Sequence, residues 1–151
     1  MTQVYSGLDA IADAAGSELG PTDWLTVTQE RVDLFADATD DHQWIHVDPA
    51  RAADGPFGAT IAHGLLTLSL LPRFMHELYR VDGVKMAINY GFNKVRFISP
   101  VPVGAKVRAR ARIEKAERLD AAVQATMVTT VEIEGVDKPA AVIESVVRYV
   151  G

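Results

Sequence analysis

Residues 64–79 read GLLTLSLLPRFMHELY, and no other stretch of the chain constrains the architecture as strongly. Its apolar side chains are spaced so closely that they occupy nearly the whole circumference of a helix, which is typical of a buried helix. Pro72 lacks the amide hydrogen that would bond to the carbonyl of Leu68, so we expect a kink or a broken turn there. A helix of this kind must be covered by another layer of secondary structure.

The chain after residue 82 can supply that layer. It contains four stretches of strand-forming residues separated by turn sequences, and they cover residues 86–98, 106–114, 123–133 and 141–149. Apolar residues recur there with a period of 2, and the short turns predict an antiparallel meander. We predict a curved antiparallel sheet wrapped around the apolar helix, which is the α+β arrangement called the hot-dog fold. A single domain over residues 1–151 is expected, with residues 1–20 as a peripheral N-terminal segment.

The composition limits the class of protein. The 151 residues are 48% hydrophobic, enough for one core without a metal or a disulfide, and the absence of cysteine excludes thiol chemistry. The net charge of −5 argues against a nucleic-acid partner, which requires a strongly basic surface. Residues 83–151 carry a net charge of +4, so a small anionic ligand would favour this half. Neither a targeting signal nor a membrane span is visible, so we expect a cytoplasmic protein without membrane contact.

The segment between the expected strand at residues 23–27 and the apolar helix carries most of the polar chemistry. A helix is predicted from about Thr28 to Thr39, and residues 40–63 then lose any regular period. At the start of this long loop, residues 38–49 read ATDDHQWIHVDP, and two carboxylates and two histidines lie within the seven positions 40–46. A carboxylate and an imidazole held close together can move protons between water and carbon at neutral pH. The loop is therefore the candidate catalytic segment.

Simpler interpretations of these residues remain open at this level. Asp40 or Asp41 can cap the preceding helix, and the spacing of Asp41, His42 and His46 also suits a metal ion. We predict no metal, because the segment lacks the helical His-Glu-x-x-His context. His63 is interpreted as a hydrogen-bonded packing residue beside the buried helix, and no chemistry is assigned to it.

The same segment resembles the signature of the MaoC-like family, the (R)-specific enoyl-CoA hydratases, in which Ser/Thr-Gly-Asp-x-Asn-Pro-Leu/Ile-His precedes Asp-Pro and a small residue. His46 matches the family histidine, Asp41 matches the family aspartate, and residues 48–50 stay in register. Residues 57–66 and 95–104 are also similar to family blocks. This chain departs from the signature glycine, asparagine and proline at Asp40, Gln43 and Trp44, which indicates a variant subgroup.

The resemblance implies a hydro-lyase that adds water reversibly to trans-2-enoyl-CoA and gives (R)-3-hydroxyacyl-CoA, with Asp41 and His46 as the acid–base pair. It also implies a homodimer and no cofactor other than the coenzyme A of the substrate. The backbone N–H of Gly64, where the helix begins, is a candidate donor to the thioester oxygen, although close packing also explains this glycine. The candidate substrate-binding residues are Gln43, Asn93, Lys94 and Arg96.

Two other functions stay open. A hot-dog thioesterase would need a carboxylate on the central helix, where Glu77 is the sole acidic residue. A non-catalytic acyl-thioester-binding partner subunit would keep the fold without the reaction. The basic row Lys106, Arg108, Arg110 and Arg112 is interpreted as the solvated face of a strand, with a coenzyme A phosphate strip as the alternative. The sequence assigns neither the base within the pair nor the acyl chain length nor the pathway.

Overall fold

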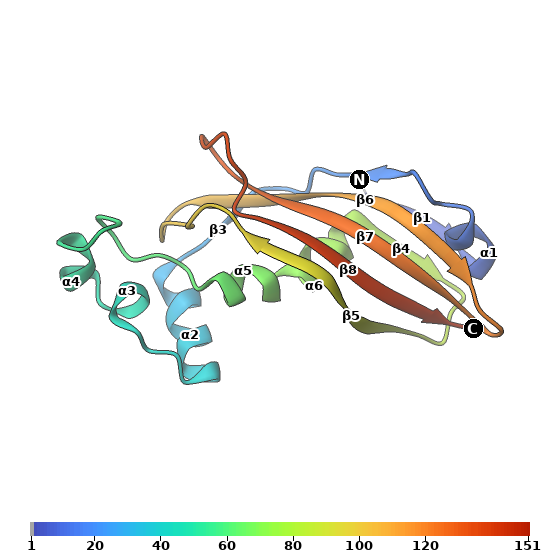
Figure 1. Cartoon of the computed structure of the whole chain (residues 1–151), viewed down its shortest axis with the longest axis horizontal. Coiled ribbons are helices and arrows are strands. Elements are labelled where there is room, and N and C mark those ends of the chain that lie inside the picture. Colours follow the sequence, from blue (N-terminus) through green and yellow to red (C-terminus); the bar gives the residue numbers. More distant parts are fainter. Residues whose placement is uncertain (1) are drawn as a thin grey trace.

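A computed structural model describes residues 2–151 and contains a long antiparallel sheet, with helices against one face and beyond one end (Figure 1). The strands are β1 (Gln3–Ser6), β2 (Glu18–Leu19), β3 (Leu25–Thr26), β4 (Tyr79–Asp82), β5 (Met86–Phe97), β6 (Lys106–Arg118), β7 (Ala122–Ile133) and β8 (Ala141–Val150). The helices are α1 (Gly7–Ala12), α2 (Gln29–Thr39), α3 (Trp44–Val47), α4 (Pro49–Ala53), α5 (Gly64–Ser69) and α6 (Leu71–Leu78). The large sheet has the order β2-β6-β7-β8-β5, and β3 also pairs with β6.

The sheet wraps around α5 and α6, which confirms the predicted hot-dog class. Alternate residues of β7 are buried along its whole length, as expected for a strand with one face against a helix. The fully buried Phe74 of α6 belongs to the same core cluster as Ile143 of β8 and Val107 of β6. No helix within residues 2–151 is long and apolar enough to cross a membrane.

The apolar stretch forms two helices rather than one. Helix α5 ends at Ser69 and α6 begins at Leu71, so the predicted broken turn lies at Leu70. Pro72 stands in the first turn of α6, where its missing N–H removes no helical hydrogen bond. The expectation of burial on all sides was wrong at the start of α5, because Leu65 is 58% exposed.

The segment of residues 40–63 contains more regular structure than we predicted. The short helices α3 and α4 lie with α2 beyond one end of the sheet (Figure 1). Asp48 caps α4 by accepting a hydrogen bond from the Arg51 amide at 3.1 Å, and Pro49 occupies the first turn. A capping residue followed by proline is a typical start of a helix, and here the helix that it starts is only five residues long.

The N-terminal segment is not peripheral in the structure. Strand β1 pairs in parallel with β4, and β2 pairs with β6 of the main sheet. Ile11 of α1 is fully buried and belongs to a second core cluster with Met127 of β7 and Ile113 of β6. Residues 2–20 therefore close one end of the core.

One core residue offers a test of the packing. Thr129 of β7 is fully buried, and its hydroxyl has no hydrogen-bond partner among residues 2–151. Thr129→Val keeps the shape and removes the unsatisfied hydroxyl, so we expect the free energy of unfolding to rise by about 1 kcal/mol. Chemical denaturation measures this, with Thr130→Val on the opposite, half-exposed face as the control. A loss of stability in Thr129→Val would contradict this account.

Candidate active site

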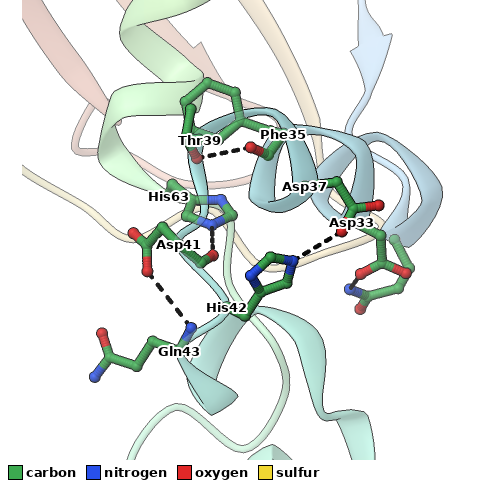
Figure 2. A network of polar contacts seen from close by, with 9 residues as sticks. Asp33, Phe35, Asp37, Thr39, Asp41, His42, Gln43 and His63 are labelled. Atoms are coloured by element: carbon green, nitrogen blue, oxygen red, sulfur yellow. Dashed lines mark hydrogen bonds and ion pairs between the residues drawn. The ribbon is translucent and has the colours of Figure 1, made fainter.

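Helix α2 and its end position Asp41. Thr28 caps the start of the helix by accepting from the Arg31 amide at 3.1 Å. At the other end, Asp40 adopts a left-handed conformation with φ of 60°, which reverses the chain. We predicted that either Asp40 or Asp41 caps this helix, and the structure shows that Asp40 does. Among residues 2–151, the exposed Asp41 side chain has only a long contact of 3.5 Å from the Gln43 amide, and it remains available for chemistry (Figure 2).

His46 is buried in α3 and is held from two sides. Its Nδ1 lies 2.7 Å from the carbonyl oxygen of Ile61, which can only accept, so Nδ1 carries the hydrogen. The other ring nitrogen, Nε2, is then left with a free lone pair. The Gln29 amide donates to the backbone carbonyl of His46 at 2.8 Å, and its own oxygen accepts from Thr60 at 2.7 Å.

The structure brings Asp41 and His46 together and adds His63 to them. One polar atom of each of the three side chains lies within 4.8 Å of the others. The His46 and His63 rings are stacked with centroids 3.9 Å apart and planes inclined by 24°. Phe35 packs on His63 as well, at 4.9 Å between centroids. A carboxylate and an imidazole lone pair thus share one end of the sheet, and their catalytic roles stay predictions.

The three side chains do not form a convincing metal chelate. An imidazole lone pair lies in the plane of its ring, so a bound ion must lie in that plane at about 2.0–2.1 Å from the nitrogen. The two stacked rings have nearly parallel planes, which do not converge at bonding distance. The alternative metal ligands Asp41, His42 and His46 do not come together either. His42 turns toward Asp37, with 2.8 Å between its Nε2 and the Asp37 Oδ1 (Figure 2).

Gly64 is the first residue of α5 and lies close to β5. A Cβ atom at this position would lie 3.1 Å from the Phe97 ring, so close packing requires glycine here. As the first helical residue, Gly64 has no acceptor for its N–H within α5. The packing explanation for Gly64 is therefore confirmed. It involves the missing side chain and not the N–H, so it does not conflict with the predicted donor role of the N–H.

The basic candidates lie apart from Asp41 and His46. Lys94 and Arg96 are exposed on β5 and stand opposite Glu144 and Val142 in the register with β8. Phe97, which packs on Gly64, points to the other face of the sheet. Asn93 lies at a register shift of the same edge strand. Within one chain Lys94 and Arg96 therefore point away from Phe97 and Gly64, whereas Gln43 lies beside Asp41.

Other acidic and basic candidates are engaged elsewhere. The Glu77 carboxylate accepts a hydrogen bond from the Asp23 amide at 2.6 Å, so it is used in joining α6 to the chain before β3. In the basic row, Arg108 and Arg110 each bind Glu132 at 2.7 Å. Arg112 pairs with Glu114 in the same way, so the three arginines of the row form a paired, solvated face of β6, as we expected.

The two arginines make a pH-dependent contribution to stability. Burial tends to raise the pKa of Glu132, but the hydrogen bonds and charges of Arg108 and Arg110 outweigh it and lower this pKa below 4.5. A lowered pKa stabilises the fold above the unfolded value and loses that effect as the pH falls through the folded value. We expect Glu132→Gln to cost about 0.5–1 kcal/mol at pH 7 and progressively less below pH 4.5 in urea unfolding. A cost that grows in acid would contradict this sign.

Sequence reasoning missed Gln29, Thr60 and the contact of His63 with Asp41 and His46. These residues approach Asp41 and His46 only through the packing of α2 against the segment that leads into α5. The sequence did contain one indication for His63. It directly precedes Gly64, the first residue of α5, so it had to lie at the helix end where the oxyanion donor was predicted.

Comparison with known proteins agrees with this geometry. The family model described as MaoC like domain matches residues 10–136. The 3-hydroxyacyl-thioester dehydratase Z of Mycobacterium tuberculosis is 61% identical over 149 residues, which are 98% of this chain and 99% of that protein.

Solved structures show the same fold. The (R)-hydratase from A. caviae involved in PHA biosynthesis has a TM-score of 0.71 at 29% identity, covering 88% of this chain and 94% of that one. A chain of the C-terminally truncated HadBC (3R-hydroxyacyl-ACP dehydratase) complex from Mycobacterium tuberculosis has a TM-score of 0.68 at 20% identity, covering 90% and 97%, and supports the fold alone. The chain therefore belongs to the MaoC-like dehydratase family and is a hydro-lyase with the hot-dog fold.

Proposed function

We propose that this protein adds water reversibly to trans-2-enoyl-CoA to give (R)-3-hydroxyacyl-CoA, and catalyses the reverse dehydration. The observation that carries the proposal is the free Nε2 lone pair of His46, fixed by the bond from Nδ1 to Ile61 and placed beside the Asp41 carboxylate. The similarity to the dehydratase Z of Mycobacterium tuberculosis and to the (R)-hydratase from A. caviae supports the same reaction class. The reaction needs no cofactor beyond the coenzyme A of the substrate.

The proposed mechanism uses the pair to hold and deprotonate one water molecule. The water oxygen forms a bond to C3 while its proton passes to the Asp41–His46 pair, and the electrons of the C2=C3 bond move toward the thioester oxygen. The resulting enolate then takes a proton at C2 from the pair. The pair accepts one proton and returns one, so its charge is the same before and after turnover.

Negative charge on the thioester oxygen requires a donor. The Gly64 N–H has no acceptor within α5, and we assign it this role. A donor of this kind contributes typically about 10²–10³-fold to the rate. Phe97 against Gly64 would keep water away from this donor.

We assign the acyl chain to an open groove of about 770 Å³ between the helices and the sheet. Its lining includes Leu68, about one helical turn after Gly64, Met75 of α6 and Val147 of β8. Two tyrosines, Tyr79 and Tyr149, also line the groove; burial raises the pKa of their hydroxyls, which bond to each other and stay neutral. A predominantly apolar groove of this kind suits a hydrocarbon chain.

We also propose that two copies pair through β5. This strand is an edge of the sheet, runs for 12 residues without proline, and exposes Met86 by 52%, Ile88 by 42% and Tyr90 by 60%. Long apolar edge strands are normally covered, because their free N–H and C=O groups pair readily with another strand. The β5 strand of a second copy, in antiparallel orientation, would cover this edge along its whole length and bury the same apolar residues of both copies.

The test of the reaction follows the enoyl-thioester absorbance of crotonyl-CoA and of a longer 2-enoyl-CoA, with chiral analysis of the product. We expect reversible hydration to the (R)-alcohol. Release of free coenzyme A without hydration would replace the proposal by the thioesterase function. Binding of acyl-CoA without any turnover would replace it by the partner-subunit function.

A further inference from the structure

His63 lies at the centre of the candidate site although no role has been assigned to it. It precedes α5, is 2% exposed, and stacks face to face on the His46 ring. Its Nε2 lies 3.0 Å from the backbone carbonyl oxygen of Asp41, 22 residues earlier in the chain (Figure 2). One imidazole thus contacts both members of the catalytic pair, on the ring of one and on the main chain of the other.

The hydrogen-bonding state of His63 shows why histidine stands here. The Asp41 carbonyl can only accept, so Nε2 of His63 carries the hydrogen and donates it. The other nitrogen, Nδ1, is buried and has no partner among residues 2–151. A buried acceptor without a partner costs about 1–3 kcal/mol. Phenylalanine would fill the same space and keep the stack without this cost, and would lose the bond to the Asp41 carbonyl, which is worth about 0.5–1.5 kcal/mol. The two effects offset each other at least in part, so stability alone does not favour histidine.

We propose that His63 is a positioning residue, which fixes the Asp41 backbone against the His46 ring through its Nε2–H bond and its stack. This inference rests on the proposed hydration reaction. The Asp41 N–H bonds to the Ala36 carbonyl at 3.2 Å and ties the residue to α2. Among residues 2–151, the other side of Asp41 is held only by the His63 bond to its carbonyl and by the 3.5 Å contact of its exposed carboxylate with the Gln43 amide. A shift of about 1 Å in a catalytic group can lower the rate by about 10²-fold. Histidine therefore provides the donor that the site needs, at a cost to stability.

Two substitutions separate the donor from the stack. His63→Phe keeps the ring contact with His46 and removes the N–H, whereas His63→Gln keeps an N–H at similar reach and removes the ring. We expect His63→Phe to be at least as stable to urea as the wild type, yet to lose about 10–100-fold in kcat with KM changed by less than about 3-fold. His63→Gln should recover at least about 5-fold of that loss in kcat. The control is His42→Gln, since His42 is exposed and bound to Asp37, and its activity should be unchanged.

Several results would overturn the proposal. These are a kcat of His63→Phe within about 2-fold of the wild type, a His63→Gln variant no better than His63→Phe, or equal losses of stability and activity in both. Long-range ¹H–¹⁵N spectra of the wild type give a test independent of activity, because the Nδ1–H tautomer of His63 would rule out the bond to Asp41. An inactive wild type with the Nε2–H tautomer would count against the hydration proposal and leave the bond itself supported.

Discussion

Replacing His46 by glutamine is expected to lower kcat/KM for enoyl-thioester hydration by about 10²–10⁴-fold, with the fold intact. Glutamine can still donate an amide hydrogen to the Ile61 carbonyl, but it has no lone pair that accepts a proton at neutral pH. Asp41→Asn removes the charge and keeps the shape, so we expect a loss of similar size. Because the two side chains act on one water, the double variant should lose little more than either single variant.

The measurement is the absorbance change on 2-enoyl-CoA for each purified variant, with circular dichroism to establish that it is folded. His42→Gln is the matched control. It makes the same substitution four residues away, at an exposed histidine that binds Asp37. Activity of His46→Gln within about 10-fold of the wild type would exclude His46 from the proton-transferring pair. Another general base would then have to be sought among the neighbours of Asp41.

The sheet and the central helices could be predicted because their residues follow a period that local geometry imposes. The alternation of β7 and the crowded apolar residues of α5 and α6 have one packing solution, and the structure contains it. The N-terminal segment could not be placed in this way. Ile11 belongs to a short six-residue helix whose burial depends on the end of a sheet formed much later in the chain.

The candidate site shows the same division. Asp41 and His46 are five residues apart and were found from the spacing of a polar segment. Gln29 and His63 contact His46 only through tertiary packing, because Gln29 lies 17 residues before it and His63 lies 17 residues after it. The faces of Lys94 and Arg96 depend on the register of β5 with β8, which no local pattern gives.

The second large effect concerns β5. Ile88→Lys is expected to weaken the proposed dimer by about 100-fold, because a two-fold interface contains the substitution twice and each copy forfeits about 1.5 kcal/mol of apolar burial. Lysine on an edge strand is also the feature by which proteins prevent strand pairing. Sedimentation velocity over a range of concentrations measures the change, and the wild type should remain a dimer where the variant is a monomer.

Leu119→Lys provides a control matched in exposure. Leu119 lies in the turn between β6 and β7 and is 42% exposed, as is Ile88, so the two substitutions add the same charge to equally exposed leucine-sized side chains. If charge or lost hydrophobicity alone altered the sedimentation, both variants would change. A monomer produced by Ile88→Lys alone would locate the contact at the edge strand. A wild type that is itself monomeric, or an Ile88→Lys variant that stays dimeric, would rule out β5 pairing, and the exposed apolar row of this strand would then require a different polypeptide to cover it.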